Sequence, residues 1–146
     1  MKVIKTEIMV DATIDQVWPV LTNFPAYSQW NPFIRGIEGR LAIGERLKVT
    51  IQPPQQKAMM FRPKIIALSP YEELAWKGSL FVPGIFDGVH RFILKKTADN
   101  KTLFTHTECF SGLLQIPLFC LIGKSTEQGF QLMNQLLKDR CELQGK

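Results

Sequence analysis

The sequence predicts an α+β fold in which a curved antiparallel sheet of about seven strands wraps around a long C-terminal helix, with two short helices after the first strand. Between residues 33 and 112, apolar and polar side chains alternate in runs separated by turn residues, which is typical of strands joined by hairpins. After Pro117 the apolar spacing becomes that of a helix for about six turns. A meander this long curls because twist accumulates between neighbours, so its concave face can cover the helix.

The first elements are a strand and two short helices. Residues 3–10 alternate in polarity and form a strand with one wet face. Apolar side chains then recur at helical spacing, at Ile14, Val17, Trp18 and Leu21. Thr13 or Asp11 can cap this helix. A second helical turn covers residues 25–29 and ends before Pro32, because the residue before a proline disfavours helical geometry.

The middle of the chain is predicted to contain strands and turns only. Pro53 and Pro54 interrupt the pattern after the second of these strands, and a hairpin turn covers residues 98–101. The predicted strands are residues 33–39, 47–52, 58–68, 74–80, 90–95 and 102–112. Together with the first strand, they make up the sheet.

The last strand leads into the C-terminal helix through an unusually apolar connection. The helix carries one apolar stripe, formed by Ile122, Phe130, Met133, Leu137 and Cys141. The connection, residues 113–119, should be covered by something. It could pack under the start of the helix, close a cavity, touch a membrane or form a dimer contact, and closing a cavity is the favoured interpretation.

Composition and charge describe an ordinary globular chain. Its 146 residues are a length for one domain, residues 1–146, and 45% of them are hydrophobic. The net charge of +5 could indicate nucleic acid or an anionic membrane as a partner. The 18 Lys and Arg residues are scattered and never form a run of four, so no nucleic-acid partner is expected.

Cysteine spacing and the apolar stretches bear on location. Cys109, Cys120 and Cys141 are odd in number and far apart, which indicates free thiols in a reducing compartment. The first residues lack the apolar core of a signal peptide, and residues 113–122 are too short to span a bilayer. A cytoplasmic protein without stable membrane insertion is expected. No nucleotide-binding or other cofactor motif occurs, so no cofactor is expected.

Two segments resemble a known superfamily. Residues 8–18 (IMVDATIDQVW), with the tripeptide Trp30-Asn31-Pro32 after them, resemble the START-like superfamily, close to its polyketide cyclase/dehydrase-like branch, called SRPBCC. Residues 104–114 (FTHTECFSGLL) resemble the same branch. The resemblance runs from about Lys2 to Cys141. It implies the helix-grip fold and a deep apolar cavity between sheet and C-terminal helix, but no particular reaction.

Three residues are candidates for chemistry. The alternation places His90, His106 and Glu108 on the concave face, with His90 roughly opposite the Glu108–Phe110 region of the neighbouring strand. A carboxylate beside an imidazole in an apolar pocket is a plausible acid–base pair. The same residues could form a satisfied polar cluster or anchor a ligand without catalysis. Two histidines and one glutamate could supply a minimal metal site, but their spacing matches no metal motif and none is predicted.

The predicted ligand-binding residues are mostly aromatic. They are Trp30, Trp76, His90, Phe92, Phe104, His106, Glu108, Phe110, Phe130 and Met133. An aromatic stripe is typical of small-molecule pockets, although a plain packed core produces one too.

Three functions therefore stay open. The leading hypothesis is a monomer or weak homodimer that binds a small hydrophobic molecule of lipid, polyketide or aromatic type. The alternative is a polyketide cyclase or dehydratase-like enzyme that uses Glu108 with His90 or His106 as acid and base. A third is a protein-interaction domain whose cavity is filled by its own side chains.

Overall fold

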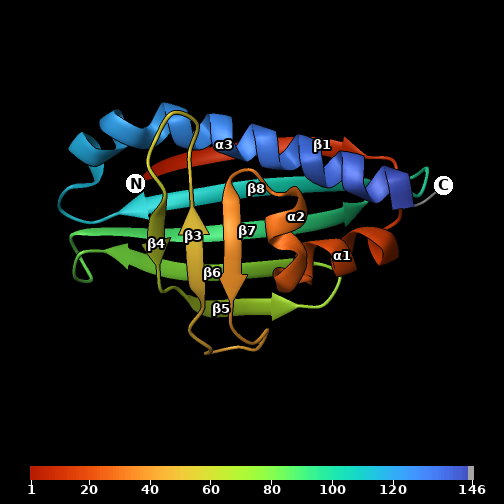
Figure 1. Cartoon of the computed structure of the whole chain (residues 1–146), viewed down its shortest axis with the longest axis horizontal. Helices are drawn as coiled ribbons and strands as arrows, with labels where there is room; N and C mark the ends of the chain where they lie inside the picture. Colours follow the sequence, from red (N-terminus) through yellow and green to blue (C-terminus); the bar gives the residue numbers. More distant parts are fainter. Residues whose placement is uncertain (145–146) are drawn as a thin grey trace.

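Two antiparallel sheets and a long helix make up the fold (Figure 1). The computed structural model describes residues 1–144. The larger sheet has the strand order β1-β8-β7-β6-β5, and the smaller one the order β2-β3-β4. In chain order the elements are β1 (Lys2–Val10), α1 (Ile14–Thr22), the 3-10 helix η1 (Phe24–Ala26), α2 (Tyr27–Trp30), β2 (Ile34–Glu38), β3 (Lys48–Ile51), β4 (Met59–Phe61), β5 (Lys64–Ser69), β6 (Glu73–Leu80), β7 (Phe86–Lys96), β8 (Thr102–Ser111) and α3 (Gln115–Gln144). The predicted fold class is confirmed.

The number of strands differs from the prediction, because the described residues form eight strands rather than about seven. The single strand predicted over residues 58–68 is divided at Pro63 into β4 and β5. Proline has no N–H to donate to a ladder, so the strand cannot continue through it. β4 pairs with β3 and β5 with β6, and the chain therefore changes sheets at this point. Figure 1 shows the small sheet running across the larger one.

Helix α3 is longer than predicted. It begins at Gln115 instead of after Pro117 and covers 30 residues. Pro117 thus lies in the first turn, where the backbone N–H groups have no partner within the helix and a missing N–H costs nothing. The helix can therefore begin directly after the turn that ends β8.

The C-terminal half of α3 packs tightly on the larger sheet. Its inward side chains are fully buried: Phe130, Met133, Leu137 and Cys141. The ring of Phe130 lies flat on the imidazole of His106, with 3.8 Å between centroids and 6° between planes, and its edge meets Phe33. Burial raises the pKa of the Cys141 thiol to about 12, so this group stays protonated and acts as a core side chain. This half of the helix leaves no room for a ligand.

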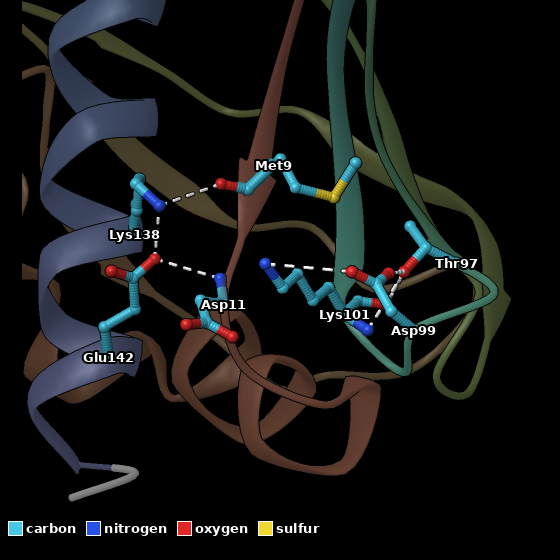
Figure 2. A network of polar contacts seen from close by, with 7 residues as sticks. All are labelled: Met9, Asp11, Thr97, Asp99, Lys101, Lys138 and Glu142. Carbon is cyan, nitrogen blue, oxygen red and sulfur yellow. Dashed lines mark hydrogen bonds and ion pairs between the residues drawn. The ribbon is translucent and has the colours of Figure 1, made fainter.

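Polar contacts anchor the end of α3 to the end of β1 (Figure 2). Lys138 donates through Nζ to the carbonyl oxygen of Met9 at 3.0 Å and pairs with Glu142. Glu142 accepts from the backbone N–H of Asp11 at 2.9 Å. Both backbone groups lie where β1 ends, so the sheet ladder does not satisfy them. The β7–β8 hairpin beside them is closed by a separate network around Asp99.

Gly129→Ala tests how closely α3 approaches the small sheet. Alanine favours helix by about 1 kcal/mol over glycine. A Cβ at this position, however, would lie 2.3 Å from Cδ1 of buried Phe33. Overpacking of this kind costs about 1–3 kcal/mol, so we expect a net loss of about 1 kcal/mol in urea unfolding. Gln131→Ala, at an exposed position two residues on, is the control and should change stability little. A Gly129→Ala variant more stable than wild type would contradict this packing.

Candidate functional site

A cavity of about 120 Å³ lies between the two sheets and the N-terminal half of α3. The larger sheet contributes side chains of β6, β7 and β8. The small sheet contributes Val49, Ile51 and Phe61 among others, Phe33 comes from the bend before β2, and the helix contributes Leu118, Ile122 and Thr126. The wall is predominantly apolar, as in sites that bind small organic molecules.

The space exists because two glycines face each other in the larger sheet. Gly78 of β6 is the register partner of Gly88 of β7, and both line the cavity. Neither has a side chain, so the floor is low between the Trp76–His90 pair and the Leu80–Phe86 pair. Pro63 approaches Gly78, where an added Cβ would lie 3.3 Å from Cβ of the proline, and Pro63 lines the cavity as well. Neither glycine is among the predicted site residues. Gly78 lies inside a predicted strand, where a glycine often marks close approach by a ligand or another group. Gly88 lies outside the predicted strand 90–95, because β7 begins earlier, at Phe86.

Glu108 and His90 form the polar part of the wall. They are register partners on β8 and β7, in the region where the sequence predicts them to meet. Oε2 of Glu108 and Nδ1 of His90 are hydrogen-bonded. The Glu108 side chain is 18% exposed and that of His90 only 2%. A Cβ at Gly88 would lie 2.7 Å from Oε1 of Glu108. The glycine therefore leaves room for the carboxyl group as well as for the cavity.

Behind this pair, a chain of hydrogen bonds leads into the core. Nε2 of His90 lies 2.7 Å from Nε2 of His106. Nδ1 of His106 lies 2.9 Å from Oδ1 of Asn134, on α3. The amide of Asn134 donates to Oγ1 of Thr6 at 2.8 Å, and Thr6 donates to the carbonyl oxygen of His106. The four residues come from β7, β8, α3 and β1, so the cluster ties the helix to three strands.

The network dictates where its protons lie. Oδ1 of Asn134 only accepts, so Nδ1 of His106 carries a hydrogen. Burial, followed by the charge of His90, holds the pKa of His106 well below its usual value, so this ring is neutral and its Nε2 accepts from His90. His90 therefore carries its hydrogen on Nε2. The hydrogen bond between Nδ1 of His90 and Oε2 of Glu108 ends the chain at the cavity wall.

The ten predicted ligand-binding residues lie in three places. Four lie on the cavity wall: Trp76, His90, Glu108 and Phe110. Five lie in the packed core: Phe92, Phe104, His106, Phe130 and Met133. Trp30 lies elsewhere, in a shallow depression beside α1 that Arg140 also lines. The assignment of a ligand to these residues stays a prediction.

The polar cluster is not arranged as a metal site. Within residues 1–144, no group of three or more His, Cys, Asp or Glu side chains is arranged to hold a metal ion. The hydrogen bonds run in a line from Glu108 to His90 and on to His106, so the three side chains do not surround a common centre. None of the helices in this part of the chain is both long enough and apolar enough to cross a bilayer.

Comparison with protein families shows which family the chain belongs to. The sequence pattern of the family described as "Polyketide cyclase / dehydrase and lipid transport" matches residues 1–131. The chain belongs to this family. The resemblance to the polyketide cyclase/dehydrase-like branch of the START-like superfamily is thereby confirmed. No curated protein sequence matches the chain. Family and fold suggest a protein that binds a hydrophobic ligand or is similar to polyketide cyclases.

Solved structures share the fold at low sequence identity. A START superfamily protein from Mycobacterium smegmatis aligns with a TM-score of 0.75 at 18% identity, over 97% of each chain. A hypothetical protein from Helicobacter pylori aligns with 0.79 at 13%, over 96% of this chain and 88% of its own. The di-domain ARO/CYC BexL, from the BE-7585A biosynthetic pathway, aligns with 0.69 at 13%, over 97% of this chain and 50% of BexL. At these identities the likeness shows the fold of the family and no more.

The neutral state of His106 predicts a dependence of stability on pH. In the unfolded chain this imidazole takes up a proton below about pH 6.5, whereas the depressed pKa keeps it neutral in the folded chain. The unfolded state then binds more protons, so stability should fall as the pH falls from about 7 to about 5, by up to about 1.4 kcal/mol per pH unit.

The free energy of unfolding, measured with urea at several pH values in this range, should depend less steeply on pH in His106→Gln than in wild type. Nitrogen NMR of the wild-type ring gives an independent check, because it distinguishes the two neutral tautomers. We expect the Nδ1–H form of His106 throughout. A ring that titrates near pH 6.5, or that carries its hydrogen on Nε2, would contradict the network.

Proposed function

We propose that this protein binds a small hydrophobic molecule in the cavity between its sheets and the N-terminal half of α3. The supporting observation is the facing pair Gly78 and Gly88, which leaves an apolar space in a sheet that is otherwise covered by side chains. A strand interior without side chains weakens a sheet and is retained where something approaches the backbone closely. Pro63 approaches Gly78 and Glu108 approaches Gly88 in this way, and a molecule bound beside them in the cavity would be a further such group.

The size of the cavity limits what it can enclose. Its volume of about 120 Å³ is close to the roughly 150 Å³ of an engineered apolar cavity that holds one benzene molecule. The enclosed part therefore accommodates one ring or a short acyl segment. Leu80, Leu118 and Ile122 on the wall are half-buried, so the cavity reaches the surface there and a longer ligand can extend outward.

This space favours ligand binding over the hypothesis of an interaction domain with a filled cavity. The C-terminal half of α3 does fill its part of the groove, with Phe130, Met133 and Leu137. The N-terminal half does not, since Leu118, Ile122 and Thr126 line the cavity there. Only one end of the groove is therefore packed by the protein itself.

Acid–base catalysis is the second candidate function, and the hydrogen bond between His90 and Glu108 on the cavity wall favours it. Glu108 lies on the cavity wall and is mostly removed from water. A carboxyl group in this position can protonate a carbonyl oxygen of a bound molecule or accept a proton from the adjacent carbon. The family description includes cyclases and dehydrases, whose reactions need such transfers.

The thiols support a reducing compartment. All three cysteines are unpaired: Cys109 is half-buried, Cys120 exposed and Cys141 buried. An exposed thiol such as that of Cys120 persists where glutathione and related thiols keep cysteines reduced. We therefore retain the cytoplasm as the proposed location.

Ile122→Trp tests the binding proposal because its indole would occupy the cavity. Binding of the uncharged fluorophore N-phenyl-1-naphthylamine, whose phenyl ring the cavity can enclose, should weaken by about tenfold or more, since the enclosed ring loses its apolar contacts. Leu121→Trp adds the same indole one residue earlier, at a position that is 74% exposed, and should bind the probe as wild type does. Equal affinities for the two variants would contradict the proposed site.

Deuterium exchange into the methyl group of acetophenone tests the catalytic candidate. This one-ring ketone is of the size that the cavity encloses, and exchange requires proton transfer beside a carbonyl. If Glu108 acts as acid and base, wild-type protein accelerates exchange in D2O and Glu108→Gln loses about 100-fold or more of that acceleration. Acceleration that Glu108→Gln retains would exclude this role for Glu108. Absence of acceleration by wild type would leave ligand binding as the function.

A further inference from the structure

Two uncharged segments meet at the end of the molecule where the cavity reaches the surface. The β6–β7 loop lies against the turn before α3, since Gly84 accepts from the N–H of Leu113 at 3.0 Å and Ile85 accepts from that of Leu114 at 2.9 Å. Figure 1 shows both at the left end of the view, beside the start of α3. Gly112 permits this approach: its φ is +109°, and a Cβ there would lie 2.5 Å from the carbonyl oxygen of Ile85.

The side chains exposed at this junction are large and apolar. We call them the rim patch: Phe81, Val82, Leu113, Leu114, Ile116 and Leu121, with exposed fractions of 42–82%. Isolated apolar side chains on a surface are ordinary, but six on two segments that are hydrogen-bonded to each other indicate an interaction site. The first turns of α3 are apolar on their outer side as well as on the side that faces the cavity. Helices in water rarely have this distribution.

The loop holds its apolar tip in place with a strained backbone. Phe81 has a φ of +70°, in the left-handed region that bulky residues seldom adopt, and its side chain is 68% exposed. Packing inside the protein therefore does not explain the strain. Buried Asp87 fixes the loop by accepting from the N–H of Gly84 and from the hydroxyl of Ser79. Strain maintained by such contacts is typical of functional sites.

Charge indicates the kind of partner. Residues 78–86 and 111–123 contain no charged side chain. Cations flank them: Nζ of Lys2 lies 5.8 Å from the ring centre of Phe119, and Lys124 is exposed one turn beyond Leu121. An apolar centre with basic flanks fits an anionic lipid surface. A second copy of this chain fits less well, because a two-fold contact would bring the flanking lysines together.

We propose that the rim patch docks on the surface of an anionic phospholipid bilayer. Phe81, Leu113 and Leu121 enter the boundary between headgroups and acyl chains, while Lys2 and Lys124 meet the phosphates. The patch is continuous with the cavity, because Leu80, Leu118 and Ile122 of the same segments form its wall. Docking thus opens the cavity toward the bilayer rather than toward water. Passage of a ligand between them rests on the proposed function, whereas docking itself does not.

Vesicle flotation tests docking directly. The probes are vesicles of phosphatidylcholine alone and of phosphatidylcholine with phosphatidylglycerol. Wild-type protein should float with the anionic vesicles and about tenfold less with the neutral ones, and each of Lys2→Gln and Lys124→Gln should weaken binding about fivefold. Phe81→Asp and Leu121→Asp should weaken it further, while Ile43→Asp, on the β2–β3 connection and 60% exposed, should not.

Other outcomes would overturn the proposal. These are no flotation of wild type, equal flotation with both vesicles, or loss of flotation in Ile43→Asp as well. Sedimentation velocity adds a further case, since a dimer that Phe81→Asp disrupts, without vesicle binding, would assign the patch to a second copy. Fluorophore binding by Phe81→Asp separates the two proposals. Unchanged affinity for the fluorophore with lost flotation supports docking as a separate function of the rim patch. Lost affinity for the fluorophore in both Phe81→Asp and Leu121→Asp would show instead that the cavity had been disturbed.

Discussion

The ring of Phe130 lies flat on the imidazole of His106, and this contact sets the distance between α3 and the larger sheet. At that separation, the large side chains toward the C-terminal end of the helix fill the groove, and the contacts of Lys138 and Glu142 with the end of β1 keep them there. Toward the N-terminal end, Leu118, Ile122 and Thr126 of the helix line the cavity, and Gly78 and Gly88 lie on its floor. The cavity therefore lies between this half of the helix and a floor that includes two residues without side chains.

The same contact controls the chemistry available at the cavity. Because Phe130 covers His106, this imidazole is buried and neutral, and Asn134 of α3 determines which of its nitrogens carries the hydrogen. The chain of hydrogen bonds continues through His90 and ends at Glu108, on the cavity wall. A buried polar chain of this kind is stable only when each member is paired, and here each is. Ligand binding and proton transfer would thus depend on one packing contact between helix and sheet.

Much of this arrangement could be predicted from sequence, and the rest required long-range information. Alternation in the last two strands placed His90 opposite Glu108, since a hairpin turn fixes the register of its own strands. The chain's change of sheets at Pro63 could not be seen, because a run of apolar residues does not reveal which partner each half pairs with. Asn134 and the pair Gly78–Gly88 were missed for the same reason. Their roles arise from contacts between segments far apart in the chain.

Native mass spectrometry of gently purified protein tests the central claim, that the cavity holds a small apolar molecule. The account predicts a species heavier than the chain by one small molecule, which organic extraction then releases for identification. That molecule should contain a ring or acyl segment that fits about 120 Å³. A protein that carries no such molecule, and whose NMR spectrum does not change on addition of a library of small aromatic and acyl compounds, would contradict the account.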